Sequence, residues 1–332
     1  MILDATLIPT TETSHPFCSA VYRCDIGNCS YVEEEYLFRG SSNIYSEESG
    51  SIHVSESGCK YSNRMIIRRP AGNLHASGKV IVEIINSTAD FDIERIWAES
   101  SGYLMRHGHV YVGITSKPNV FPAFKKFDED RYIDLNWENP HPERRKADKD
   151  GYGLSIGAKD QEMGLIWDML IDLPLFLRGK DKANPLQDIE AKSFFLAGWS
   201  QSSGYISCFI KNFVNQFQKC RNLYNGYLCA GGIHTVVVPL NSIDAETMHG
   251  KDSITRIDHI HVPYIELNTE SENSDDYEGM GYTARRDDSD RPGFLYRYME
   301  IAGGLKYMST GEIRRTLLAR ALISKKKLLI LN

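Results

Sequence analysis

The 332-residue sequence lacks the features that would direct it to a membrane or to nucleic acid. No apolar run approaches the roughly 20 residues of a membrane-spanning helix. The N-terminal stretch has no basic segment followed by an apolar core, so we expect no secretory signal. The net charge of −6 argues against nucleic acid or an anionic membrane surface as a partner. These absences predict a cytoplasmic protein.

Cysteine is present but is not arranged for metal binding or for a disulfide framework. The seven cysteines are an odd number and are scattered along the chain. Only Cys24 and Cys29 stand close together, with four residues between them and no second pair to complete a zinc site. We therefore expect reduced, structural thiols and no bound metal.

Strand-like and helix-like segments alternate along most of the chain. Short β-branched runs at residues 78–87 and 108–116 enclose a segment of helical periodicity at 91–107, which predicts a parallel strand–helix–strand crossover. Further strands are expected near 192–198, 224–232, 262–269 and 293–304, and further helices near 159–179 and 201–217. The first seventy residues have the pattern of an antiparallel edge. The fold class is therefore α/β, with a mostly parallel, doubly wound sheet and an antiparallel N-terminal edge.

Residues 117–158 form a long polar connection that contains proline and several aromatic residues. Long loops of this kind often serve as lids or pocket walls, and we expect this segment to be such an insertion. Its charge run "ERRKADKD" is typical of a solvated face.

The stretch "FFLAGWSQSSGY", residues 194–205, indicates a strand that turns directly into a helix. Gly198 and Ser202 lie two residues before and after Ser200, where small side chains allow a tight turn around a nucleophile. The Gln201 amide, at the start of the helix, would then stabilise an oxyanion. A serine at this place is also a common helix N-cap, and this alternative stays open.

Six segments together resemble a poorly characterised bacterial family of the α/β-hydrolase superfamily. They follow one another in the order and spacing of that family over roughly residues 25–304. The segments are "GKVIVEIINS", "RHGHVYVGITS", "DEDRYIDLNWENP", "FFLAGWSQSSGY", "YNGYLCAGG" and "YRYMEIAGG". The resemblance implies one α/β-hydrolase-like domain over residues 1–304, with the α/β-hydrolase fold.

The resemblance also implies a reaction and a set of site residues. The expected activity is that of a serine hydrolase of carboxylic-ester type, which needs no metal and no organic cofactor. Its partner would be a small-molecule ester substrate, with Ser200 as the nucleophile. The second oxyanion amide should come from Asn86 or Ser87, in the loop that follows the strand "VEIIN".

In such folds the acid follows the serine and precedes the histidine. Two glutamates stand just beyond the predicted strand at 262–269, namely Glu270 and Glu272. The usual spacing from the start of this strand favours Glu272, although members of the family commonly have acidic residues at both positions. Either glutamate could instead be a solvated charge, because the segment "ESENSDDYE" is acidic throughout.

The histidine of the triad is missing from its expected place. The resemblance places it shortly after "YMEIAGG", where this sequence has Lys306, and no histidine follows His261. A lysine with an ordinary pKa is a poor general base at neutral pH. His259 and His261 flank the start of the acid strand, at the wrong end for the site, whereas His234 could line the pocket.

The last 28 residues, 305–332, differ in character from the rest of the chain. "STGE" and "LLILN" resemble the signature loop and the following strand of an ATP-binding-cassette ATPase, although Asn332 stands where the aspartate would be. The sequence contains no phosphate-binding loop of the form G-x-x-x-x-G-K-[ST], so we do not expect ATPase activity. The tail could be native or a foreign fragment joined near Gly304. The loss of the histidine together with the gain of a cassette motif favours the foreign fragment.

These observations predict a member of a serine ester hydrolase family whose activity is impaired because the base is absent. Two alternatives remain. One is a non-catalytic protein that binds small molecules on a hydrolase scaffold, and the other is a fragmentary cassette ATPase fusion.

Overall fold

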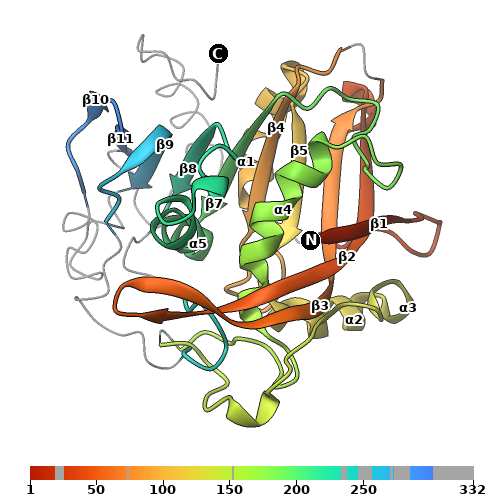
Figure 1. Ribbon diagram of the computed structural model, residues 1–332. Coiled ribbons are helices and arrows are strands. Elements are labelled where there is room, and N and C mark those ends of the chain that lie inside the picture. The colour runs from red at the N-terminus through yellow and green to blue at the C-terminus, as the bar shows by residue number, and fades with distance from the viewer. Residues whose placement is uncertain are drawn as a thin grey trace. The chain divides into compact units, whose positions relative to one another are not determined.

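The computed structural model describes residues 1–18, 26–72, 75–151, 153–232, 238–245, 256–269, 272 and 285–301 (Figure 1). The chain divides into two compact units. The first contains the described residues within 1–194 and 238–249, and the second those within 195–237 and 250–332. Glu270, Lys306, His234 and the tail at 305–332 lie outside the described residues.

The strands of the first unit form an antiparallel region that continues into a parallel pair. The order of its strands is β1-β2-β3-β5-β4, and the short strand β6 pairs with β3. Only β4 and β5 run parallel, whereas the other pairs are antiparallel. The bounds are β1 Ile2–Ile8, β2 Tyr31–Glu48, β3 Ser51–Pro70, β4 Lys79–Ile85, β5 Val110–Thr115 and β6 Asn136–Trp137.

The antiparallel N-terminal edge that the sequence predicts is present, and two of its strands are long. β2 has 18 residues and β3 has 20, and Figure 1 shows the two as one long twisted ribbon. Their register shifts at Ser42 and Ile44, where the alternation of facing side chains is interrupted. Polar residues within β2 do not interrupt the strand, because hydrogen bonding to a neighbouring strand does not depend on side-chain polarity.

The predicted strand–helix–strand crossover is confirmed. Helix α1 (Arg95–Arg106) connects the parallel strands β4 and β5, and its buried side chains include Ile96 and Trp97. The carboxylate of Glu83, on β4, accepts hydrogen bonds from the backbone amides of both residues, at 2.9 and 3.0 Å. The carboxyl group of Glu83 therefore provides acceptors for amides at the start of α1, which have no partner within the helix.

The predicted connection at residues 117–158 contains short regular elements. They are a 3-10 turn at Pro118–Val120, α2 (Phe121–Phe127), α3 (Glu129–Tyr132), β6 and a 3-10 turn at Pro142–Arg144. A turn at Met163–Leu165 leads into α4 (Ile166–Arg178), whose side chains are mostly buried, as the sequence predicts. A further 3-10 turn at Gly27–Cys29 precedes β2.

A buried network of charged side chains joins β2, β3 and the segment that precedes α1. Arg64 lies at its centre, with Nε 2.5 Å from Glu35 and Nη1 3.1 Å from Asp92. The Nε atom of Arg131 lies 2.5 Å from Oε2 of Glu35. Arg68 forms a further ion pair with Glu94. These residues are almost wholly buried, so each charge depends on its partners for the interactions that water would otherwise provide.

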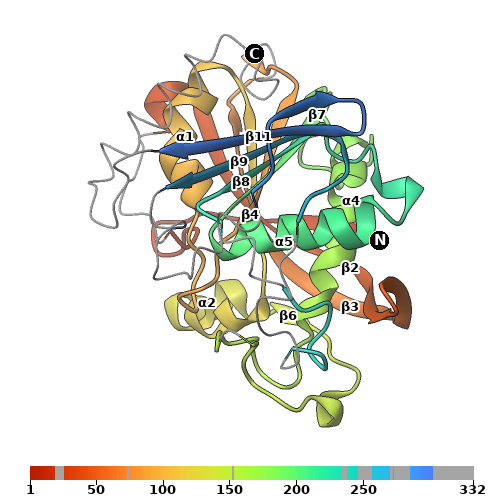
Figure 2. The same cartoon turned by 90° about the vertical axis from the view of Figure 1, so that its left-hand side faces the viewer.

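The second unit holds a parallel set of strands. Their order is β7-β8-β9-β11-β10, in which all neighbours are parallel except the short hairpin of β10 and β11. Figure 2 shows β8, β9 and β11 side by side. The bounds are β7 Ser193–Trp199, α5 Gln201–Phe209, a π-helical turn Ile210–Val214, a 3-10 turn Gln218–Cys220, β8 Gly226–Ala230, β9 Ile260–Thr269, β10 Ser289–Arg291 and β11 Phe294–Ile301.

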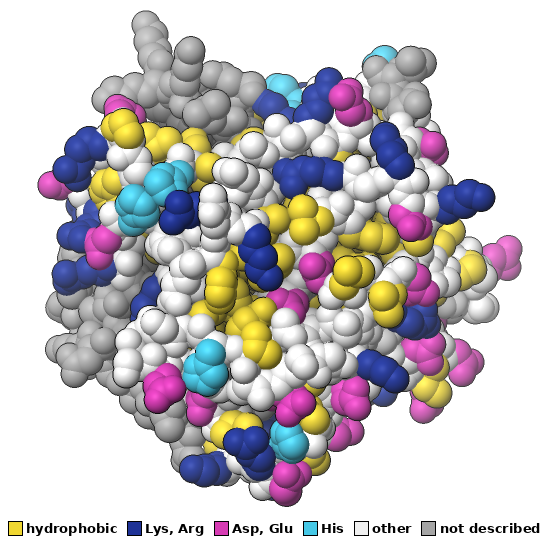
Figure 3. All heavy atoms as spheres, viewed as in Figure 1, with side chains coloured by type: hydrophobic (Ala, Val, Ile, Leu, Met, Phe, Trp, Pro, Cys, Tyr) yellow, Lys and Arg dark blue, Asp and Glu magenta, His cyan; other side chains and the backbone are white. Residues whose placement is uncertain are grey.

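These elements confirm the α/β fold class, with parallel strands preceded by an antiparallel N-terminal edge. On the face shown in Figure 3, basic and acidic side chains are interspersed. None of the helices in the described part of the chain is long and apolar enough to cross a membrane.

Replacement of Arg64 should destabilise the first unit strongly. We expect Arg64→Met to lower the free energy of unfolding by about 3–5 kcal/mol, because it leaves buried carboxylates without their partner. Arg39→Met is the matched control, since Arg39 is partly exposed and its ion pair with Asp134, at 3.0 Å, is also exposed. Its effect should stay below about 1 kcal/mol. Urea denaturation measures both, and equal effects would contradict the role assigned to the network.

Glu83 should make stability depend on pH. Burial raises the pKa of its carboxyl from 4.5 to about 8, against the opposing effect of its hydrogen bonds. The folded state therefore binds a proton more tightly than the unfolded state does. This stabilising contribution is complete below pH 4.5 and is lost as the pH rises to about 8.

We expect Glu83→Gln to remove this dependence. Between pH 5 and pH 8, the free energy of unfolding of the unchanged protein should fall by roughly a few kcal/mol more than that of the variant, because a difference of one in pKa between the folded and unfolded states corresponds to about 1.4 kcal/mol. Urea denaturation at a series of pH values measures the two slopes. Glu47→Gln, at an exposed position of β2, is the control, and parallel slopes for Glu83→Gln and the unchanged protein would refute the prediction.

Candidate functional site

Ser200 lies at a sharp turn between β7 and α5. Its backbone has φ +57° and ψ −122°, a combination that a residue other than glycine rarely adopts. The turn is held by two backbone hydrogen bonds: the Ser200 amide donates to the Ala230 carbonyl at 2.9 Å, and the Ser203 amide donates to the Ser200 carbonyl at 2.9 Å. This geometry exposes the serine at the carboxyl end of a parallel strand.

The N-cap alternative is not supported by the side chain of Ser200. This residue occupies the N-cap position of α5, but its hydroxyl makes no capping hydrogen bond to the helix. A capping serine normally has extended backbone angles and bonds to an amide in the first turn. The backbone angles of Ser200 differ from those of a capping serine, and the residue is exposed.

The turn fits only because its neighbours are small. A Cβ atom on Gly198 would lie 2.7 Å from the backbone carbonyl of Ser202, and one on Gly232 would lie 2.4 Å from the Cβ of Ser203. The Ser203 hydroxyl donates to the carbonyls of Gly198 and Ala230, both at 3.1 Å. It therefore ties the end of β7, the start of α5 and the end of β8 together.

The small residues Gly198 and Ser202 were expected from the sequence, whereas the roles of Ser203, Gly231 and Gly232 were not. Gly231 has φ +54°, and a Cβ there would lie 2.8 Å from the Trp199 ring. The dipeptide "GG" at the end of "YLCAGG" indicates a need for small residues. The reason for that need becomes clear only when β8 is placed beside β7.

The predicted oxyanion residues lie in both units. Gln201 begins α5, and its side chain is buried. Amides in the first turn of a helix have no partner within the helix, which makes this position suitable for an anion. In the first unit, Asn86 and Ser87 follow β4 directly, and both are buried. The Asn86 amide donates to the Ile93 carbonyl at 3.3 Å, so it would have to leave that bond to act as a donor.

Glu272 lies three residues beyond the end of β9. Its carboxylate accepts hydrogen bonds from both the amide and the hydroxyl of Thr269, each at 2.6 Å. These contacts fix the carboxylate close to the strand from which the acid is expected. Glu270, the other candidate, lies outside the described residues.

The strand register carries Ser200 and Glu272 to the same edge of the second unit. Trp199 on β7 is paired with Ala230 on β8, and Ala230 with Leu267 on β9. Ser200 therefore leaves its strand at the level at which β9 nears its end. Two strand spacings of about 4.8 Å separate β7 from β9.

Strand β11 ends at the same edge as β9. This strand is parallel to β9, and its last residue, Ile301, is paired with Thr269. The chain therefore leaves β11 at the same edge, five residues before Lys306, which itself lies outside the described residues. His259 and His261 lie at the opposite, amino end of β9, as expected, so neither can serve as a base at this edge.

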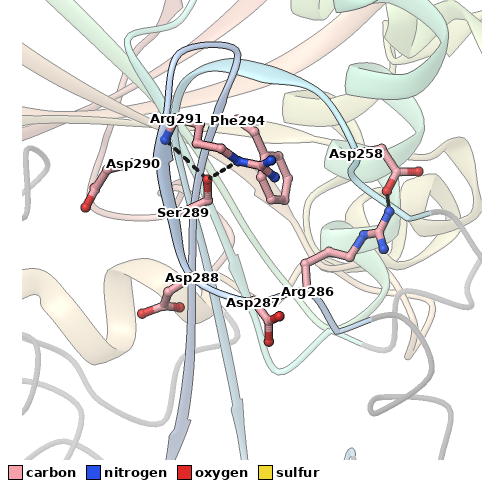
Figure 4. A pocket seen from close by; sticks show the side chains of 8 residues that line it. All are labelled: Asp258, Arg286, Asp287, Asp288, Ser289, Asp290, Arg291 and Phe294. Atoms are coloured by element: carbon pink, nitrogen blue, oxygen red, sulfur yellow. Dashed lines mark hydrogen bonds and ion pairs between the residues drawn. The ribbon is translucent and has the colours of Figure 1, made fainter.

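A polar pocket lies beside the hairpin of β10 and β11, and it differs in character from the serine turn. Figure 4 shows that its aspartates point in different directions and do not converge. Its side chains largely interact with one another: Arg286 contacts Asp258, and Arg291 donates to Ser289 at 3.4 Å. The residues that line it are Asp258, Arg286, Asp287, Asp288, Ser289, Asp290, Arg291 and Phe294.

Comparison with known proteins gives one clear family match. A family model described as "Alpha/beta hydrolase domain" matches residues 4–309. The match therefore reaches five residues past the boundary predicted at residue 304. No curated protein matches the chain.

Solved structures with a similar fold include several esterases, all at low identity. An arylesterase is 11% identical over 85% of this chain and 83% of its own, with a TM-score of 0.43. A hyperthermophilic esterase from Pyrobaculum calidifontis is 9% identical over 86% and 82%, with a TM-score of 0.42. Esterase 2 of Thermogutta terrifontis, phosphoramylated by tabun, is 8% identical over 85% and 93%, with a TM-score of 0.41. Likenesses of this size are too weak to indicate a reaction.

We expect Gly198→Ala to destabilise the protein by about 1–3 kcal/mol, because the added methyl group meets backbone atoms that cannot move without opening the turn. Gly72→Ala is the matched control, since nothing lies within 4 Å of the position of its added Cβ. Thermal unfolding of the two variants compares them directly. Similar shifts in Tm would show that crowding at the turn is unimportant.

Proposed function

Since the chain belongs to the alpha/beta hydrolase domain family, we propose that it is a serine hydrolase that acts on carboxylic esters. The observation that carries this proposal is the backbone of Ser200, held at φ +57° between a buried parallel strand and a helix. Such a turn has no structural need for a serine, since a glycine would adopt it without strain. A strained serine that caps nothing and is exposed at the strand end is suited to attack a substrate.

The reaction follows the usual course of acyl transfer. The Ser200 oxygen bonds to the acyl carbon of the ester while a base accepts the hydroxyl proton, and the carbonyl electrons move to oxygen. The Gln201 amide, with Ser87 or Asn86 as the second donor, stabilises that oxyanion. Collapse of the intermediate breaks the bond to the alcohol, which leaves with the proton. Water then hydrolyses the acyl-serine by the same steps.

The acid of the triad is Glu272, with Glu270 as the alternative. Glu272 is the better candidate because Thr269 holds its carboxylate beside the end of β9. Its role is to orient the base and to stabilise the positive charge that the base acquires. In a background that restores the base, Lys306→His, removal of that charge by Glu272→Gln should lower kcat far more than KM.

The weak point of the site is its base. The resemblance places a histidine at position 306, where the sequence has lysine. A protonated lysine cannot accept the serine proton, so turnover should lie several orders of magnitude below that of a complete triad. A non-catalytic protein that binds small molecules on the same scaffold is the second candidate, and this substitution is the observation that favours it.

A fluorophosphonate probe tests the proposal. We expect slow labelling of the unchanged protein at Ser200, with p-nitrophenyl ester turnover that is lost in Ser200→Ala. Ser193→Ala, at the other end of β7, is the control and should leave both unchanged. Lack of labelling and of turnover, with ligand binding that survives Ser200→Ala, would favour the binding protein.

Lys306→His tests the missing base separately. If position 306 is the place of the base, the variant should raise kcat for p-nitrophenyl esters by at least about tenfold, since a general base commonly contributes two to four orders of magnitude. The gain should disappear in the double variant Ser200→Ala, Lys306→His. An unchanged kcat would show that position 306 does not supply the base.

A further inference from the structure

Two exposed histidines converge at the start of β9. His259 immediately precedes the strand and His261 is its second residue, so the two side chains project from the same face. Their Nε2 atoms lie 3.0 Å apart, and the planes of the two rings are inclined at 86°. This pair plays no part in the proposed ester hydrolysis.

The backbone around the pair is well anchored. The Ile260 amide, between the two histidines, donates to the Gly293 carbonyl at 2.8 Å, and the Asn215 side chain donates to the His259 carbonyl at 3.2 Å. Gly293 also lies against the rings, because a Cβ there would be 3.0 Å from Cε1 of His259. The turn before β11 therefore limits where the two imidazoles can move.

The separation of the two nitrogens suits a shared metal ion. An imidazole nitrogen binds Zn²⁺ at about 2.0–2.1 Å, so two such ligands lie about 2.9–3.4 Å apart for bond angles between square and tetrahedral. We propose that His259 and His261 chelate a divalent transition-metal ion, with preference for Cu²⁺ over Ni²⁺ and Zn²⁺. Imidazole suits all three ions, and their general order of affinity places Cu²⁺ first.

Binding requires a change of tautomer. In the pair as it stands, one Nε2 donates its hydrogen to the other, whereas a metal ion needs the lone pairs of both. The donor ring must move its hydrogen to Nδ1, after which both neutral rings can bind the ion without loss of a proton. Within the described ranges, no group of three or more metal-binding side chains is placed to hold an ion, so water would complete the coordination.

The charged groups nearby are mostly engaged with one another. Asp258, which precedes the pair, contacts Arg286, and Asp290 contacts Arg297. No salt bridge within the described part of the chain involves either histidine. The site is also remote from Glu272, because the ten residues of β9 separate the two by about 30 Å along the strand.

Titration of the untagged full-length chain with CuCl₂ and with ZnCl₂, followed by calorimetry, tests the proposal. We expect saturable binding that His259→Gln and His261→Gln each weaken by about tenfold or more, and a double variant that loses the site. His53→Gln, an exposed histidine on β3, is the matched control and should not alter it. Ester turnover and fluorophosphonate labelling should be the same in all these variants.

Gly293→Ala separates chelation from independent binding by two histidines. It keeps both imidazoles but crowds the His259 ring, whose Cε1 would lie 3.0 Å from the new Cβ, and strains the turn, where φ is +83°. Chelation therefore predicts weaker binding, whereas independent binding predicts no change. Circular dichroism and Tm confirm that the variants are folded. The proposal is overturned if the unchanged protein shows no saturable binding, if the double variant binds as tightly as the unchanged protein, or if His53→Gln weakens binding equally.

Discussion

The backbone of Ser200 is held at a positive φ by the packing of two strands and a helix around it. Its amide is bonded to Ala230, while the Ser203 hydroxyl links the end of β7 to the end of β8. Three glycines, Gly198, Gly231 and Gly232, leave the space that these contacts need. Strain at one residue, of order 1–3 kcal/mol, persists because several contacts oppose its relief.

The parallel register of the second unit brings this turn to the edge at which the neighbouring strands also end. Since Trp199, Ala230 and Leu267 lie in one row across β7, β8 and β9, the residues that follow these strands emerge at a common edge.

The first unit relies on a different interaction. Buried arginines and carboxylates connect its long antiparallel strands. Each charged side chain must have its partner, because a buried charge without one lowers the free energy of unfolding strongly.

The turn at Ser200 could be predicted because its geometry follows local rules. Ser200 and Gln201 were expected at the start of a helix because a strand, a turn and small flanking residues are adjacent in sequence, and α5 begins there. Ser203 and Gly231 were missed because their function is to fit a neighbouring strand, and no local pattern reveals that neighbour. The bond between the Asn86 amide and Ile93 was likewise unforeseen, since an isolated bridge leaves no periodic signal.

The sequence by itself determined the α/β class, the crossover from β4 to β5 and the candidate nucleophile, because hydrophobic periodicity and small residues at a turn act over a few positions. The sequence also shows that position 306, where the resemblance places the histidine, is a lysine, and this holds for any fold. Only the tertiary structure decided the strand order, the level at which Ser200 and Glu272 leave their strands, and the meeting of His259 with His261. Those features depend on which strands become neighbours and in which register, and that is settled by packing across residues far apart in the chain.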